Sequence, residues 1–222
     1  MSTVCASCSG RCCYDIVVRV TPLDIWRIAR AQRLAFDEIV VPWREPEPTP
    51  AGVQIDATSE RYATILGQHP VEAGACAFLM HVGEDVKRCG IYADRPIVCR
   101  VYPFVVNKGS IDIRPDARCA PTDWNLATLD YGGFRAGFGR YAAEEAAAAV
   151  IVRAWNERVA SGELAPSFAA YLAFAEAACA AFPHIDGTGA SLERWNEALL
   201  PDDVVAAHSA WLVAVAAATP RR

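Results

Sequence analysis

The sequence is poor in lysine, with only Lys87 and Lys108, and its formal net charge is −5. A surface that binds nucleic acid needs clustered Lys and Arg side chains, because these displace counterions from the phosphates. The net negative charge therefore argues against a general nucleic-acid-binding protein. We expect no nucleic-acid partner.

The sequence also lacks a long apolar run. Hydrophobic residues make up 53% of the chain and charged residues 21%, a balance typical of a compact globular protein. Nowhere do about eighteen apolar residues follow one another without a charge, as a membrane-spanning helix requires. The opening residues Met-Ser-Thr-Val-Cys show neither the basic start nor the apolar stretch of a secretory signal. We therefore expect no membrane contact and a cytoplasmic location.

Cysteine, by contrast, is abundant, with nine residues. Disulfides are rare in a reducing cytosol, so grouped cysteines there are more often metal ligands or catalytic groups. Cys179 lies on the apolar stripe of a predicted helix and is interpreted as a small buried hydrophobic residue. The other eight precede residue 120: Cys5, Cys8, Cys12, Cys13, Cys76, Cys89, Cys99 and Cys119.

Local signals predict a strand and a helix directly after the first cysteines. Residues 15–20 suit a short strand, and a helix of about three turns is expected to follow. Thr21 is a suitable N-cap, Pro22 suits the first helical position, and Asp24 is favourable at the positive end of the helix dipole.

Prolines and turn residues mark the middle of the chain. Four prolines within residues 42–58 predict an extended loop, with a brief strand at 53–55. Residues 101–106 and 110–114 predict a β-hairpin, because Gly109 can adopt the positive φ that such a turn needs.

After Trp124 alanine dominates and strand signals disappear. Apolar residues at helical spacing predict a long helix that begins near residue 134 and ends near Gly162. A second helix is expected over residues 167–182, with two more after Ser191 and Pro201. The fold class predicted is α+β, with a small cysteine-rich metal-binding domain of short strands and helices followed by an Ala-rich helical bundle or cap. The boundaries are 1–124 and 125–222.

The first four cysteines are spaced Cys5-x2-Cys8-x3-Cys12-Cys13. Two thiolates two residues apart can both turn toward one metal from a tight loop. The spacing differs from the bacterial ferredoxin run, from the radical SAM triplet, and from a zinc ribbon, which needs a second C-x2-C pair. Common templates therefore do not settle which metal these cysteines bind.

A longer motif runs from Cys89 to Phe104 and reads C-x-I-Y-x-x-R-P-x-x-C-R-x-Y-P-F. Within this motif, a short helical turn is expected to begin at Arg95-Pro96 and to present Cys99. Together with the early cysteine loop and the Gly-x-Cys-x-Phe-Leu element at Cys76, the motif resembles the YkgJ-type cysteine-cluster family, the CxxCxxCC zinc- or iron-chelating domain. This family also includes the flagellin lysine N-methylases. The resemblance covers about residues 3–122 and leaves out the Ala-rich half.

The resemblance implies that all eight N-terminal cysteines act together as metal ligands. Thiolates suit both iron–sulfur clusters and zinc. We favour an iron–sulfur cluster of the [4Fe–4S] type, in a protein with a redox or group-transfer role. The alternatives are a structural zinc module that binds another protein, and a protein methylase. The methylase is disfavoured because the sequence has no Gly-rich nucleotide fingerprint.

Three further residues of the signature, Arg95, Arg100 and Tyr102, are predicted to adjoin the cofactor and to offset the thiolate charge, or to contact an anionic substrate group. His81 is a weaker candidate ligand. Glu144 and Glu145 are interpreted as part of a solvated helix face. Metal ions are the expected partners, with a protein partner or protein substrate as a further possibility.

Overall fold

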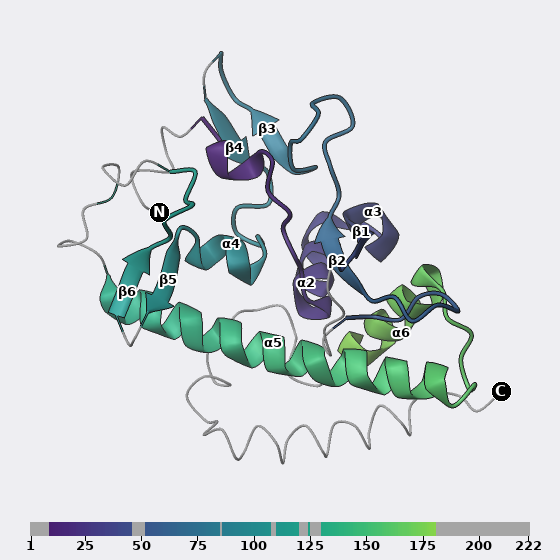
Figure 1. Cartoon of the computed structure of the whole chain (residues 1–222). Coiled ribbons are helices and arrows are strands. Elements are labelled where there is room, and N and C mark those ends of the chain that lie inside the picture. Colours follow the sequence, from purple (N-terminus) through teal and green to yellow (C-terminus); the bar gives the residue numbers. More distant parts are fainter. Residues whose placement is uncertain are drawn as a thin grey trace.

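The structure is a computed structural model that describes residues 9–45, 52–84, 86–107, 110–119, 124 and 130–180 (Figure 1). Short helices and antiparallel strand pairs precede two longer helices, so the α+β prediction is confirmed. In chain order the elements are η1 (Arg11–Cys13), α2 (Pro22–Gln32), α3 (Phe36–Ile39), β1 (Val40–Arg44), β2 (Tyr62–Leu66), β3 (Leu79–His81), β4 (Lys87–Cys89), α4 (Ile97–Val101), β5 (Phe104–Asn107), β6 (Ser110–Ile113), α5 (Tyr131–Ala160) and α6 (Phe168–Ala180).

The start of α2 follows the local signals. The hydroxyl oxygen of Thr21 accepts a hydrogen bond from the backbone N–H of Asp24 at 3.1 Å, and the Asp24 carboxylate accepts one from the backbone N–H of Thr21 at 3.0 Å. This reciprocal capping box satisfies two backbone donors that the helix itself leaves unpaired. The predicted N-cap and helix length are confirmed.

The chain before α2 is extended but does not form the predicted strand at 15–20. It contacts β2 through an isolated bridge between Arg19 and Ile65 and through two backbone hydrogen bonds, one from the N–H of Val20 to the carbonyl of Thr64 at 3.0 Å. The contacts are too few for a continuous ladder. They nevertheless tie the segment that follows Cys13 to the core.

The predicted loop over 42–58 is wrong at its beginning, because residues 40–44 form β1. Pro42 lies opposite Thr64 in the antiparallel β1–β2 pair. A proline is tolerated there because, among the described residues, β1 pairs with β2 alone, so the missing N–H can face away from the ladder. Val53, in the predicted brief strand, makes a single bridge to Tyr62.

The predicted hairpin is confirmed as the β5–β6 pair, with Asn107 opposite Ser110. Its first strand begins at Phe104 rather than at 101, because Val101 ends α4, the helical turn expected after Pro96. The Phe104 ring packs edge-on against Phe134 of α5, with ring centroids 4.4 Å apart. Gly109 lies outside the described residues.

The long helix α5 runs along one side of the described fold (Figure 1). Helix α4 packs against α5, as do α2 and α6. Trp155 of α5 is fully buried between the rings of Tyr171 and Phe174. The predicted helix end is confirmed, since Gly162, with φ +77°, follows the last turn.

Cys179 of α6 is buried in the core, as predicted. The same hydrophobic cluster contains Ile28 of α2 and Ile151 of α5, so residues on both sides of position 124 share it. The division into two domains stays a prediction. The helices predicted after Ser191 and Pro201 lie outside the described residues, and among the described helices none is long and apolar enough to span a membrane.

A buried ion-pair network joins α2 to α5. Arg27 is 8% exposed and contacts the carboxylates of Asp24 and Glu144, the latter at 2.8 Å. Glu144 is 1% exposed, so its assignment to a solvated face was wrong. The helical period of α5 places Glu144 toward the core, where Arg27 and Arg140 offset its charge.

Candidate metal centre

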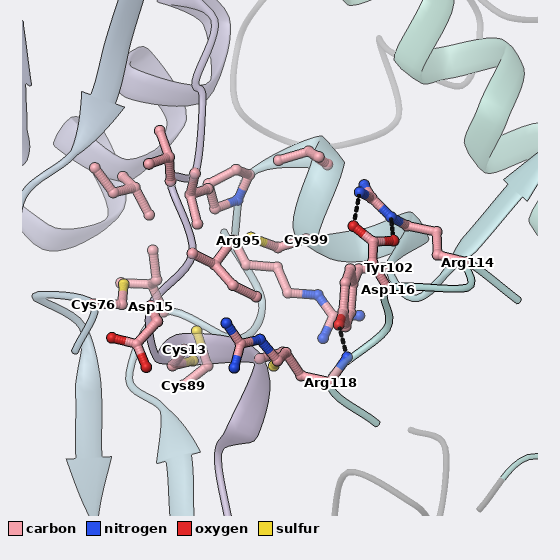
Figure 2. Close-up of a pocket in the computed structure, with 18 residues that line it drawn as sticks. Cys13, Asp15, Cys76, Cys89, Arg95, Cys99, Tyr102, Arg114, Asp116 and Arg118 are labelled. Carbon is pink, nitrogen blue, oxygen red and sulfur yellow. Dashed lines mark hydrogen bonds and ion pairs between the residues drawn. The ribbon is translucent and has the colours of Figure 1, made fainter. Parts of the chain in front are cut away.

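A cavity of about 390 Å³ lies between the extended segment before α2, the β3–β4 hairpin and α4 (Figure 2). Four separate stretches of the chain contribute cysteines to its wall. Isoleucine, valine and leucine side chains, three arginines, two aspartates, one proline and one tyrosine complete the lining. The cysteines that line it are Cys12, Cys13, Cys76, Cys89 and Cys99.

The early cysteine loop is joined to Cys76 by main-chain hydrogen bonds. The N–H of Cys76 donates to the carbonyl of Cys13 at 2.8 Å. Gly10 precedes the single turn η1 with φ +74°, and a Cβ there would lie 2.9 Å from Cδ1 of Leu79. Glycine is therefore needed for the turn that carries Cys12 and Cys13 to pack against the hairpin.

The hairpin and α4 supply the other two cysteines. Cys89 is the last residue of β4 and lies opposite Leu79 of β3, so the pairing brings the strand ends near Cys76. Cys99 lies in α4, whose first N–H, that of Ile97, donates to the Asp24 carboxylate at 2.8 Å. The buried network described above therefore also anchors the helix that carries Cys99.

The charges of the five cysteines act on one another. A hydrogen bond between the side chains of Cys12 and Cys13 lowers the pKa of Cys12 to about 7 and raises that of Cys13. Burial raises the pKa of Cys76 to about 11, and burial followed by the charge of Cys76 raises the pKa of Cys99 well above its ordinary value. Burial also raises the pKa of Cys89. These thiols are thus grouped closely enough for one to oppose ionisation of the next.

The grouping is not yet a closed coordination site. Within the described ranges, no three Cys, His, Asp or Glu side chains are arranged so that they could hold a metal ion. A single metal ion at this cavity would therefore require the sulfur atoms to draw closer together than they are here. Such movement is ordinary for sites that form together with the metal they bind.

Among the described residues, one of the predicted ligands, Cys119, does not line the cavity. Cys5 and Cys8 lie outside the described part of the chain. Cys119 is half-buried after β6. Burial, followed by the charge of Cys119, raises the pKa of Tyr102, which does line the cavity. His81 is exposed and hydrogen-bonds to Glu72 instead, with Nε2 and Oε2 2.7 Å apart.

The predicted neighbours of the cofactor separate into two groups. Arg95 and Tyr102 line the cavity, and the Arg95 guanidinium stacks on the Tyr92 ring at 4.1 Å. After the hydrogen bond from Cys13, the charge of Arg95 also lowers the pKa of Cys12, and it opposes the rise that burial causes in the pKa of Cys89. Arg100 does not line it; its Nε donates to the carbonyl of Arg95 at 3.0 Å and so holds the loop before α4. The Tyr102 hydroxyl accepts a hydrogen bond from the backbone N–H of Arg118.

Sequence reasoning missed four polar residues of the wall: Asp15, Arg114, Asp116 and Arg118. Arg114 and Asp116 form a bidentate ion pair, in which Nε of Arg114 lies 2.9 Å from Oδ1 of Asp116 and Nη2 lies 2.7 Å from Oδ2. Asp15 lies two residues after Cys13, the last cysteine of the first group, and Arg118 directly precedes Cys119. Proximity to the cysteines was the available signal, but it could not tell which neighbours face the cavity.

Beside η1, a polar cluster fastens the early loop to the hairpin. The Glu72 carboxylate accepts hydrogen bonds from the Tyr14 hydroxyl and from Nζ of Lys87, the latter at 2.9 Å. These contacts and the one with His81 lower the pKa of Glu72 to about 2 from an ordinary value of 4.5. The cluster thereby joins the chain at Cys13 to the strand that ends at Cys89.

We expect Glu72→Gln to reduce the acid sensitivity of the fold. Because the folded-state pKa of Glu72 is depressed, its ionised form stabilises the protein fully above pH 4.5, and this contribution is lost as the pH falls toward about 2. Thermal melts across that window should show a shallower pH dependence for Glu72→Gln than for the parent chain. Glu84→Gln, at an exposed position of the same hairpin, serves as the control; equal slopes for both variants would contradict the expectation.

Five cysteines that converge on one cavity and are flanked by arginines define a cysteine-rich domain with the thiol donors that a metal-chelating protein needs. A family model described as "CxxCxxCC: Putative zinc- or iron-chelating domain" matches residues 4–120. The match covers more than half of the chain, so the protein belongs to this family, and the resemblance seen in the sequence is confirmed. A search of curated proteins and a search of solved structures each found no match.

Proposed function

We propose that the protein holds an iron–sulfur centre in this cavity. The observation that carries the proposal is the lining of one cavity of about 390 Å³ by five cysteines from four stretches of chain. A structural zinc site is closed, with four ligands about 2.3 Å from the ion, and leaves little unfilled space between them. A cavity of this size favours a larger inorganic group with thiolate ligands.

The donor set and the local charge fit such a centre. Thiolates are the usual ligands of iron–sulfur clusters. The proposed ligands include Cys12, Cys13, Cys76, Cys89 and Cys99, with Cys5, Cys8 and Cys119 as the remaining thiols of the set. Arg95 and Arg118 on the wall offset the negative charge that several thiolates would bring together.

The protein's own residues would position and shield the centre. Arg100 holds the loop that carries Arg95, and the Asp24 carboxylate fixes the start of the helix that carries Cys99. The apolar part of the wall limits access of water and so lowers the local dielectric. When bound, an iron–sulfur centre supplies one-electron transfer or a Lewis-acidic iron, which is the basis for a redox or group-transfer role.

The proposed location is a reducing, cytoplasmic compartment, because thiol ligands must stay reduced to bind metal. Cys12, Cys13, Cys76, Cys89 and Cys99 are all free thiols in the structure. The segment 125–222 would act as a helical unit that supports the cysteine-rich unit 1–124.

Anaerobic purification tests the metal assignment. The isolated protein is expected to be brown, with visible thiolate-to-iron absorption and with iron and acid-labile sulfide in equal amounts. Removal of the metal by a chelator under reducing conditions should abolish the absorption. A colourless protein with stoichiometric zinc and no sulfide would contradict the proposal and favour the structural zinc module.

A further inference from the structure

The cavity has features that metal binding by itself does not require. Part of its wall is apolar, formed by residues 16–18 with Leu66, Ile91 and Val98. Its volume lies within the range of about 300–1,000 Å³ that is usual for small-molecule sites. The wall therefore combines thiols, cations and hydrocarbon around one space.

Arg118 is the cation best placed to take a ligand. In Figure 2 its side chain extends across the cavity toward the cysteines. Among the residues that the structure describes, its guanidinium forms no ion pair, and its hydrogen bond to the Tyr102 hydroxyl uses the backbone N–H. Arg114 is instead bound to Asp116, and Arg95 stacks on Tyr92.

The charge balance of the wall selects the kind of anion. Three arginines and two aspartates line the cavity, which leaves one formal positive charge before any thiolate forms. A guanidinium matches the planar geometry of a carboxylate through two parallel hydrogen bonds. Each thiolate that forms lowers this positive balance further, so a singly charged group suits the cavity better than a doubly charged phosphate.

We infer that the cavity binds a small organic carboxylate, with its charged end on Arg118 and its hydrocarbon part against the apolar wall. The inference rests on the proposed function in that the ligand would share the cavity with the metal centre. It names the class of small molecule on which a redox or group-transfer centre here would act. Carboxylate binding is nevertheless measurable without turnover.

Isothermal titration of the anaerobically purified full chain with hexanoate tests the inference. Hexanamide, which has the same hydrocarbon part and no charge, is the matched ligand control. Hexanoate is expected to bind about tenfold or more tightly than hexanamide, because a charge-assisted hydrogen bond is lost with the amide. Hexyl phosphate is the third probe; tighter binding of this probe than of hexanoate would overturn the carboxylate assignment.

Arg118→Gln should weaken hexanoate binding about tenfold or more and leave hexanamide binding unchanged, whereas Arg118→Lys should restore part of the affinity. Arg153→Gln, at an exposed position of α5, is the matched control and should bind like the parent chain. Failure of the parent chain to prefer hexanoate would overturn the inference, and so would unchanged binding in Arg118→Gln.

Iron and sulfide analysis of the same samples keeps the two proposals apart. Hexanoate binding by a protein that contains no iron would support the carboxylate site and contradict the iron–sulfur centre. A different outcome is a parent chain that contains iron and sulfide but binds no hexanoate, together with an Arg118→Gln variant that loses iron. In that case the role of Arg118 is to offset the negative charge of the iron–sulfur centre. That outcome would overturn the inference and leave the proposed function standing.

Discussion

Arg27→Met is expected to lower the free energy of unfolding by about 3–5 kcal/mol, the cost of leaving buried charges without their partner. Arg27 contacts both Asp24 and Glu144, and each carboxylate is 1% exposed. Methionine keeps much of the volume but none of the charge. Chemical denaturation followed by circular dichroism measures the loss.

The remaining hydrogen bonds set where in that range the loss should fall. Glu144 keeps Arg140 at 3.1 Å, and the Asp24 carboxylate keeps the backbone N–H groups of Thr21 and Ile97. Burial already raises the pKa of Asp24, and the charge of Arg27 opposes that rise. Without Arg27 the carboxyl takes up a proton more readily, so the loss of stability should be larger at neutral pH than in mild acid.

Two controls separate the buried charges from general damage to α2. Arg30→Met changes an exposed arginine of the same helix, which stacks on Trp26, and should cost well under the loss at Arg27. The triple variant Asp24→Asn, Arg27→Met and Glu144→Gln should recover much of the stability, because it removes the three buried charges together. Equal losses for Arg27→Met and Arg30→Met would show that the network contributes little.

Cys99→Ala is expected to lose most of the bound iron and of the visible absorption. The charges of Cys76, Cys12 and Cys89 all act on the Cys99 thiol, so its sulfur lies among the other candidate ligands. Removal of one thiolate leaves the centre with an incomplete ligand set. Iron, sulfide and absorption per protein chain are the quantities to measure, after anaerobic purification.

Cys179→Ala is the matched control, because it removes the same side chain from a position far along the chain and buried in the core. Its iron content should equal that of the parent chain, although its melting temperature should fall slightly. Circular dichroism of Cys99→Ala must first show native helix content. A folded Cys99→Ala with full iron content would contradict the role of Cys99, and so would equal iron loss in both variants.

The features predicted correctly are those with local causes. The start of α2 depends on three neighbouring residues, Thr21, Pro22 and Asp24, and its capping box forms as expected. The end of α5 follows from Gly162, and the core position of Cys179 from helical spacing on α6. Helix caps and apolar periodicity act over one or two turns, so the sequence contains them in full.

The errors have long-range causes. Pro42 favours a loop locally, yet residues 40–44 pair with a strand some twenty positions later and form β1. Glu144 is buried because Arg27, 117 positions earlier in the chain, offsets its charge. Neither partner can be identified from local propensity, because pairing between distant segments depends on how the whole chain packs.

By itself, the sequence determined the cysteine-rich family and the eight candidate thiols, because residue identity and spacing are local properties of the chain. It also determined the helices that frame them. Tertiary structure alone decided that Cys13 lies beside Cys76, that Arg118 faces the cavity and that Arg100 does not line it. The physical reason is that a cavity wall is built from segments far apart in sequence, and backbone pairing and packing decide which of their side chains face the same space.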